Sequence, residues 1–305
     1  MREVWFHRDF RGYSGGHGKV FDYFGHVDAH PEFAARIYFT EGSVDADNPW
    51  RRTGVDVASA WRPEQADVLL LAGSDWSSVP DDRPGRPVLN LVQGVRHADP
   101  AEPLFNFLSR RAVRVCVSRP VADAIIATGR VNGPVITIEA GLELPGLPRK
   151  ASVPGRIFIA AAKQPQLGAA LAERLRADGR DVDLAIAWTD RASFLGRLAD
   201  AERAVMLPFD AEGFFLPGLE AMALGVAAVI PDCVGNRDYL DHGTNALAPA
   251  LELEALVDAV RDLDDPQRRA QLARAGRQTA ARFSVARERS AVHAVLDRLD
   301  ELWTS

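Results

Sequence analysis

The sequence predicts an α/β fold with two doubly wound parallel sheets. Short apolar runs alternate along the chain with segments of helical period, which is the pattern of βα units and of buried parallel strands. A stretch rich in Pro and Gly, residues 142–155, interrupts this alternation and has neither period. At 305 residues, the chain is long enough for two α/β domains that each bury a core.

The apolar runs give the expected strands in order. In the first half they are residues 3–7, 35–39, 67–73, 88–94, 114–118 and 135–141. In the second half they are residues 156–162, 182–188, 203–209, 227–232 and a weaker run at 245–250. Each is short, apolar and followed by a turn or a helical segment, as expected for strands of a parallel sheet.

The linker sets the expected domain bounds. We place an N-terminal domain at 1–148 and a C-terminal domain at 149–284. The tail, 285–305, has apolar residues at helical spacing from Val292 to Leu302 and is predicted to be an amphipathic helix. We expect this helix to cross back and pack on the N-terminal domain.

Composition narrows the classes of partner. A net charge of −6, from 36 basic and 42 acidic residues, argues against a nucleic-acid partner. The two cysteines are too few for a disulfide scaffold. No run approaches the ~18 apolar residues of a membrane span, and the N-terminus lacks the apolar stretch of a signal peptide. We therefore expect a cytoplasmic location.

The Arg-rich segment 268–289 allows two interpretations. A solvated helix face is the first, because exposed helices commonly carry such charge. Peripheral contact between these C-terminal helices and an anionic membrane surface is the second.

Two acids, Glu212 and Glu220, flank an apolar loop in the stretch DAEGFFLPGLEAMALG, between a predicted strand and a predicted helix. Ligands of open parallel sheets bind at the carboxyl ends of the strands, where Glu212 is expected. Glu220 is expected in the first turn of the helix, whose free N–H groups favour an anion. A carboxylate accepts two hydrogen bonds, which suits vicinal hydroxyls. The pair predicts a nucleotide-sugar site; the alternative makes Glu220 a capping residue and Glu212 a surface acid.

The stretch EGFFLPGLEAMALGVAAVIPDCVGNRDYLDHGTNAL, residues 212–247, resembles the donor-site pattern of the retaining family-4 glycosyltransferases, which have the GT-B fold. The matching positions are Glu212, Gly213, Phe214, Leu216, Pro217, Leu219, Glu220, Ala221, Met222, Ala223, Gly225, Asp232 and Gly235. Phe215 and Ala227 depart from the family's usual Gly and Pro. The resemblance implies two Rossmann-like domains that face each other across a cleft.

The resemblance also implies roles for these residues. Glu212 would contact hydroxyls of the transferred sugar, and Glu220 the ribose hydroxyls of the nucleotide. The backbone of Phe214, Phe215 and Leu216, next to Gly213, would hold the diphosphate. Phe215 would either shape an unusual sugar pocket or close it.

Three further positions resemble family features outside this stretch. Gly15 and Gly16 look like a Gly-Gly turn whose backbone faces the donor phosphates; a plain structural turn is the alternative. His97, near the end of a predicted strand, looks like a histidine close to the transferred sugar; a surface histidine is the alternative. Lys163 looks like one of the two cations that neutralise the leaving diphosphate.

The second of those cations is missing from its expected position, where Gln166 and its neighbours stand. Arg96 and Arg11 are candidates to replace it. Asp75 and Trp76 follow a predicted strand and could bind the acceptor, with Arg96 beside them; ordinary packing of Trp76 is the alternative.

The resemblance implies transfer of a glycosyl group from a nucleotide-diphosphate sugar to a hydroxyl acceptor, with retention of the anomeric configuration. The leaving diphosphate, stabilised by Lys163, would assist deprotonation of the acceptor. We expect no metal and no other cofactor, and an acceptor that is a small molecule or an oligosaccharide of a glycan or natural-product pathway. The alternatives are a non-catalytic GT-B-like protein that binds a nucleotide sugar or serves a partner enzyme, and a sugar-nucleotide epimerase.

Overall fold

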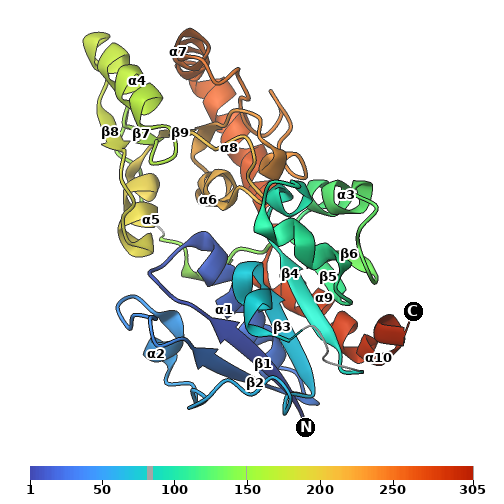
Figure 1. Cartoon of the computed structure of the whole chain (residues 1–305). Helices are drawn as coiled ribbons and strands as arrows, with labels where there is room; N and C mark the ends of the chain where they lie inside the picture. Colours follow the sequence, from blue (N-terminus) through green and yellow to red (C-terminus); the bar gives the residue numbers. More distant parts are fainter. Residues whose placement is uncertain (81–84, 149, 305) are drawn as a thin grey trace. The chain divides into compact units, whose positions relative to one another are not determined.

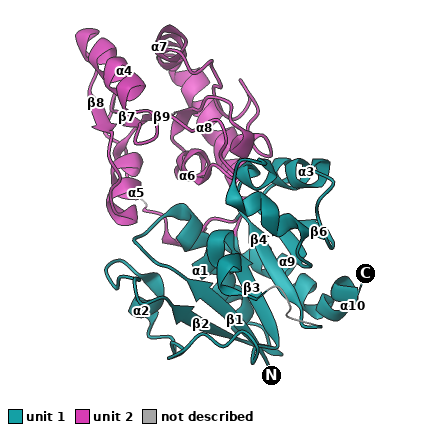
Figure 2. Cartoon of the chain, in the orientation of Figure 1, with its two compact units in different colours: residues 1–140, 285–305 teal, residues 141–284 magenta. Residues whose placement is uncertain are grey.

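A computed structural model describes residues 1–80, 85–148 and 150–304. It divides into two compact units, which are coloured separately in Figure 2. Unit 1 comprises residues 1–140 and 285–305, and unit 2 comprises residues 141–284. Each unit is built on one parallel sheet, so the predicted α/β class with two doubly wound sheets is confirmed.

The sheet of unit 1 has the order β2-β1-β3-β4-β5-β6, and every pairing in it is parallel. Its strands are β1 (Arg2–Arg8), β2 (Phe33–Phe39), β3 (Val68–Ala72), β4 (Val88–Val92), β5 (Val113–Cys116) and β6 (Val135–Thr137). Every residue of β3, β4 and β5 is buried. These central strands are mostly apolar because helices cover both of their faces, and the two polar residues within them, Asn90 and Arg114, are buried as well.

The helices of unit 1 are seen around this sheet in Figure 1. They are α1 (Gly15–Asp28), α2 (Pro49–Thr53), α3 (Arg119–Ala127), α9 (Val285–Asp297) and α10 (Leu299–Thr304), with 3₁₀ turns at Gly73–Ser78, Val95–Ala98 and Pro103–Ser109. The long helix α1 begins where the Oγ of Ser14 accepts the N–H of His17 at 3.2 Å. A serine cap of this kind satisfies one of the otherwise unpaired N–H groups at a helix start.

A buried polar cluster joins α1 to α9, which comes from the other end of the chain. The Nζ of Lys19 lies 2.7 Å from Asp22 and 3.0 Å from the Oε2 of Glu288. The Nε2 of His26 lies 3.2 Å from the same Glu288 oxygen. Lys19, His26 and Glu288 are all buried. The tail therefore packs against α1 through charge as well as through its apolar face.

The bounds of the units differ from the predicted ones in two respects. Unit 2 begins at Gly141 rather than at residue 149, because the N–H of Leu142 donates to the carbonyl of Phe283 at 2.9 Å and Leu142 is buried in the core of unit 2. Arg149 itself lies outside the described residues. The tail, predicted to be one helix, forms α9 and α10 and is grouped with unit 1.

The sheet of unit 2 has the order β10-β9-β7-β8 and is also parallel throughout. Its strands are β7 (Ile157–Ala160), β8 (Val182–Ala185), β9 (Arg203–Met206) and β10 (Ala227–Val229). Its helices are α4 (Pro165–Ala177), α5 (Arg191–Asp200), α6 (Leu216–Leu224), α7 (Leu253–Asp262) and α8 (Pro266–Ala280), with 3₁₀ turns at Leu144–Gly146 and Val234–Asn236. The weak run at 245–250 makes isolated bridges, from Leu247 to Val229 and from Ala246 to His242.

Two apolar clusters form the core of unit 2. One of them contains Phe158, Phe215, Leu219 and Tyr239, and the other contains Ile157, Leu171 and Val205. Neighbouring strand residues Ile157 and Phe158 fall in different clusters, as expected when side chains alternate between the faces of a sheet. The site described below lies at the carboxyl edge of this sheet.

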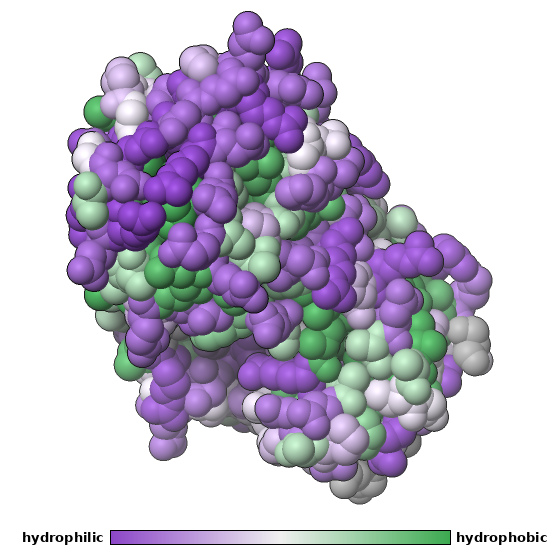
Figure 3. Space-filling model, turned by 90° about the horizontal axis from the view of Figure 1, so that it is seen from above, coloured by the Kyte–Doolittle hydropathy of each residue, from purple (hydrophilic) through white to green (hydrophobic). Residues whose placement is uncertain are grey.

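Several arginines of the basic segment 268–289 bind other parts of unit 2. Arg268 donates to the carbonyl of Gly243, Arg269 binds Glu202 at 2.9 Å, and Arg277 donates to the carbonyl of Leu224. These three arginines are therefore bound within unit 2, whereas Arg274, Arg282, Arg287 and Arg289 of the same segment are exposed, and its contact with a membrane stays a prediction. Among the described residues, no helix is long and apolar enough to cross a membrane. The face shown in Figure 3 is largely hydrophilic, with apolar residues in separate patches.

Candidate active site

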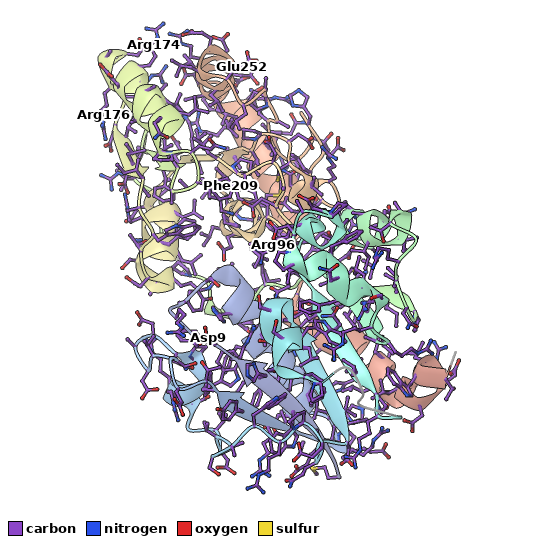
Figure 4. All side chains as sticks on the ribbon, in the orientation of Figure 1. Asp9, Arg96, Arg174, Arg176, Phe209 and Glu252 are labelled. Carbon is purple, nitrogen blue, oxygen red and sulfur yellow. The ribbon has the colours of Figure 1, made fainter. Side chains whose placement is uncertain are left out.

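Charged and aromatic side chains gather at the carboxyl ends of three neighbouring strands of unit 2. Lys163 follows β7, Trp188 and Arg191 follow β8, and Phe209 and Glu212 follow β9. The carboxyl ends of parallel strands lie at one edge of the sheet, which is where open α/β sheets bind ligands. Trp188 and Phe209 are large aromatic residues with 74% and 51% of their surface exposed, and Phe209 is labelled in Figure 4.

Lys163 and Glu212 form an ion pair within this group. The Nζ of Lys163 bonds to the Oε1 of Glu212, and each side chain is only 15% exposed. The same Glu212 oxygen accepts the N–H of Phe209 at 3.2 Å. The Lys163 Nζ also lies 4.9 Å from the ring centroid of Phe215, 5.8 Å from that of Phe209 and 6.0 Å from that of Trp188. Lys163 is thus a partly buried cation held by one carboxylate and three aromatic rings.

Glu220 and Arg191 form the second ion pair of the site. The Nη1 of Arg191 lies 2.5 Å from the Oε1 of Glu220, whose side chain is 2% exposed against 40% for Arg191. Burial raises the pKa of Glu220, and the neighbouring guanidinium opposes that rise. The sequence predicts Glu220 in the first turn of α6. The helix starts at Leu216, so Glu220 lies just beyond that turn. Its environment is therefore that of a buried ion pair rather than of a helix cap.

The loop before α6 uses two of the amides that the sequence predicts to bind phosphate. The N–H of Phe215 donates to the carbonyl of Gly235 at 2.8 Å, and the N–H of Leu216 donates to the carbonyl of Phe214 at 3.0 Å. The Phe215 carbonyl accepts the hydroxyl of Tyr239 at 2.6 Å. The turn is thus fixed by bonds within unit 2, and these two amides are already engaged.

The side chain of Phe215 belongs to the core. It is 2% exposed and packs in the same apolar cluster as Leu219 and Tyr239. Its departure from the family's glycine therefore fills the interior below Lys163 with an aromatic ring, and the ring does not project into solvent. That Phe215 either shapes or closes a sugar pocket stays a prediction; the structure adds that its ring is buried, with the centroid 4.9 Å from the Lys163 Nζ.

A second loop, from the end of β10 to Asn236, holds the Glu212 loop in place. The N–H of Val234 donates to the carbonyl of Asp210 at 3.0 Å. Asn236 is fully buried, accepts the N–H of Cys233 at 3.1 Å and donates to the carbonyl of Pro231 at 2.8 Å. The two loops approach so closely at Gly235 that a Cβ there would lie 2.8 Å from the Cβ of Glu212 and 2.9 Å from the N of Phe215.

We expect the substitution Gly235→Ala to displace the Glu212 loop. The new methyl group would meet backbone atoms, which cannot rotate away, so the free energy of unfolding should fall by roughly 1–3 kcal/mol. Gly196→Ala in α5 is the matched control, since a Cβ there meets no atom within 4 Å, and replacing a helical glycine should stabilise by roughly 0.5–1 kcal/mol. Chemical denaturation of both variants measures the difference. Equal effects would contradict the close approach of the two loops.

Gly15 and Gly16 lie in the first turn of α1 in unit 1, rather than in a free turn before it. A Cβ at Gly15 would meet nothing within 4 Å, and one at Gly16 would make ordinary contacts with Gln93 at 3.5 Å and Ser14 at 3.7 Å. Neither residue has a positive φ. Nothing within the described chain therefore requires glycine here, which is compatible with the close approach of a ligand to this backbone.

His97 is buried in the 3₁₀ turn that follows β4, whereas Arg96 beside it is exposed and is labelled in Figure 4. Burial, together with the charges of Arg96 and Arg114, lowers the pKa of His97 to about 4. The imidazole is therefore neutral near pH 7 and can both donate and accept a hydrogen bond. A surface histidine is excluded by its 3% exposure.

We expect His97 to make the protein sensitive to mild acid. An unfolded histidine with a pKa of about 6.5 gains a proton as the pH falls, while His97 in the folded chain stays neutral until about pH 4. The unfolded state then binds more protons, so stability is lost between these two values. The loss from about pH 7 to pH 5 should be roughly 2 kcal/mol smaller in His97→Gln than in the wild type. Denaturation at both pH values measures it, and an equal loss would contradict the burial of a neutral imidazole.

Asp75 and Trp76 are interior residues, so the predicted acceptor platform is wrong. Asp75 accepts from the Nη2 of Arg8 at 2.6 Å and from the N–H of Ala72 at 2.9 Å, and it is 4% exposed. Trp76 is 2% exposed and stacks on Phe107 with ring centroids 6.1 Å apart. The alternative of ordinary packing holds for Trp76, because the 3₁₀ turn after β3 folds it into the core of unit 1.

Other charged and polar side chains have local roles. Arg11, a candidate second cation, binds Asp9 at 2.9 Å, and Asp9 is labelled in Figure 4. His26 and His30 bind Glu288 and Asp297 and do not converge on a common point. Within the described ranges, no group of three or more His, Cys, Asp or Glu side chains is arranged to hold a metal ion.

Sequence reasoning missed Trp188, Phe209 and Arg191. Trp188 and Phe209 end two of the predicted strand runs, and the rule that ligands lie at carboxyl ends of strands could have singled them out. Arg191 carries no such signal, because only the fold brings it to Glu220.

Comparison with known proteins places these units in a known fold. The family model described as "Glycosyl transferases group 1" matches residues 150–265. No curated protein matches the chain in sequence.

Among solved structures, HepE of Anabaena in complex with UDP and glucose is 14% identical with a TM-score of 0.77, over 98% of this chain and 100% of that one. Sucrose-phosphate synthase of Thermosynechococcus elongatus is 13% identical with a TM-score of 0.72, over 99% of this chain and 100% of that one. A glycosyltransferase of Rickettsia africae is 11% identical with a TM-score of 0.72, over 99% of this chain and 98% of that one. The chain therefore has the GT-B fold, and residues 150–265, within its unit 2, match the group 1 glycosyl transferase model.

Proposed function

We propose that this protein transfers a glycosyl group from a nucleotide-diphosphate sugar to a hydroxyl acceptor, with retention at the anomeric carbon. The observation that carries the proposal is the pair of acids Glu212 and Glu220, placed with Lys163 and Arg191 at one edge of the unit 2 sheet. This edge lies within the segment that matches the group 1 glycosyltransferase model. HepE, similar in fold, binds UDP-glucose, which makes uridine donors the first to test.

Each residue of the site has a distinct part in the proposed reaction. Glu212 accepts hydrogen bonds from hydroxyls of the transferred sugar, and Glu220 accepts them from the ribose. Lys163 neutralises charge that develops on the leaving diphosphate, which is the main contribution that such a site makes to the rate. The diphosphate oxygen then takes the proton of the acceptor hydroxyl as that hydroxyl attacks the anomeric carbon from the same face. Contributions of Gly15, Gly16 and His97 from unit 1 stay predictions.

The test is release of nucleoside diphosphate from a panel of UDP-, GDP-, ADP- and dTDP-sugars in the presence of small hydroxyl acceptors and oligosaccharides. Release that depends on the acceptor supports transfer, and an unchanged rate in EDTA supports the proposed independence of metal. The anomeric configuration of the product, measured by NMR, decides between retention and inversion.

The second candidate is a non-catalytic protein that binds a nucleotide sugar. One observation favours it: the amides of Phe215 and Leu216 donate within unit 2, which leaves fewer donors for a leaving diphosphate than the family pattern implies. Saturable binding of a nucleotide sugar without release in any acceptor mixture would favour this candidate. We also propose a cytoplasmic location, which fractionation of cells tests.

A further inference from the structure

The two ion pairs of the site use cations from different parts of unit 2. Lys163, after β7, binds Glu212, and Arg191, at the start of α5, binds Glu220 at 2.5 Å. The family pattern places both cations of the diphosphate site after the first strand of this domain, where this chain has Lys163 alone. Arg191 is therefore a second cation in the same group of residues, and the fold brings it there from the end of β8.

The Glu220 carboxylate needs a partner whether or not a nucleotide is bound. Its side chain is 2% exposed, and an ionised carboxylate at that depth is costly unless it is hydrogen-bonded or paired. Arg191 supplies that partner in the present structure. Two ribose hydroxyls can supply it instead, because each donates one hydrogen bond to a carboxylate oxygen.

Displacement of the guanidinium from Glu220 leaves a cation that needs an anion. A nucleoside brings hydroxyls for Glu220 but no anion for Arg191, whereas a nucleoside diphosphate brings both. Guanidinium groups bind phosphate oxygens with paired, charge-assisted hydrogen bonds, which are stronger than neutral ones. The exchange is therefore balanced in charge only for the phosphorylated ligand.

Arg191 is built to move between two anions. It is the first residue of α5, and the Asp190 side chain caps that helix by accepting the N–H of Ser193 at 2.9 Å. The helix start is thus fixed by its cap, whereas the Arg191 side chain is 40% exposed and so accessible to a ligand. Trp188, on the same short loop, has its ring centroid 6.0 Å from the Lys163 Nζ, so this loop borders the surroundings of the first cation.

We infer that Arg191 is the second cation of the diphosphate site, and that it stays on Glu220 until the ribose of the donor displaces it onto the phosphates. This inference rests on the proposed binding of a nucleotide sugar. It makes the protein discriminate against nucleosides, since a ligand without phosphates must displace Arg191 without compensation.

Calorimetric titration of wild type and Arg191→Gln with UDP, UMP and uridine, and with the GDP and ADP series, tests the inference. In Arg191→Gln, affinity for the diphosphate should fall roughly 10-fold or more. Affinity for the nucleoside should stay the same or rise, because its competitor for Glu220 is gone. Arg191→Lys, which keeps the charge and loses the fork, should recover part of the diphosphate affinity.

The control is Arg174→Gln, which removes a charge from α4, elsewhere in unit 2. Arg174 is labelled in Figure 4. The control variant should leave all affinities unchanged. If Arg191→Gln weakens nucleoside and diphosphate by the same factor, or leaves both unchanged, while the wild type binds the diphosphate, the inference fails and the proposed function stands. If the wild type binds no nucleotide and no nucleotide sugar, the proposed function fails and the inference falls with it. Arg191→Lys carries the test if Arg191→Gln does not fold.

Discussion

Replacing Glu212 with Ala should lower turnover with the donor by about 100-fold or more, while the affinity for nucleoside diphosphate stays within a few-fold of the wild type. The loss follows from the proposed role of Glu212, which holds the transferred sugar. Removal of one such polar contact to a reacting group commonly costs two to three orders of magnitude in rate. Steady-state release of nucleoside diphosphate and calorimetric titration separate the two quantities.

Two comparisons sharpen this prediction. Glu220→Ala should mainly weaken nucleotide binding, because Glu220 is assigned to the ribose. Glu252→Gln removes a charge from an exposed residue of unit 2, labelled in Figure 4, and should change neither quantity. Equal and mild effects of Glu212→Ala and Glu220→Ala on both quantities would refute the assignment of the two acids.

Replacing Glu288 with Leu should destabilise unit 1 by about 3 kcal/mol, the lower end of what loss of one partner from a buried ion pair costs. Glu288 is 2% exposed and binds both Lys19 and His26. Burial alone would lower the pKa of Lys19, but the charges of Glu288 and Asp22 outweigh it and raise that pKa. Lys19 is therefore a charged ammonium, and it loses a buried carboxylate partner when Glu288 is removed.

Chemical denaturation followed by circular dichroism measures this effect. The double variant Lys19→Met with Glu288→Leu should lose less stability than the sum of the two single variants, because neither charge is then left without its partner. Glu301→Ala is the control, since its pair with Arg298 lies on the surface of α10, and it should show no measurable change. Additive losses in the double variant would show that the two charges are not coupled.

The fold was predictable from the sequence because its signals are local. Each central strand of unit 1 is a short, mostly apolar segment, as expected for a buried parallel strand. The loop that holds Glu212 follows a strand of the same kind, β9, in unit 2. The unit boundary was displaced because it depends on a bond between Leu142 and Phe283, which the sequence places far apart.

The site was predictable only where a charged residue directly follows a strand that the sequence also predicts. Glu212 and Lys163 each follow a strand of the same sheet and do meet. Asp75 follows a strand as well, yet Arg8 pairs with it in the interior. Residue order cannot tell these cases apart, because whether a side chain after a strand faces solvent or the core depends on the next turn. The Arg191–Glu220 pair could not be foreseen for the same reason.

The division of unit 1 between the two ends of the chain has a consequence for biosynthesis. Glu288 and the rest of α9 leave the ribosome after all of unit 2 has been made. Until then, Lys19 and His26 on α1 lack the buried carboxylate of Glu288, and unit 1 is an incomplete domain. All residues of unit 2 are present by that time, so unit 2 can fold first. A nascent chain halted shortly before residue 285 should therefore hold a protease-resistant unit 2 and a protease-sensitive unit 1.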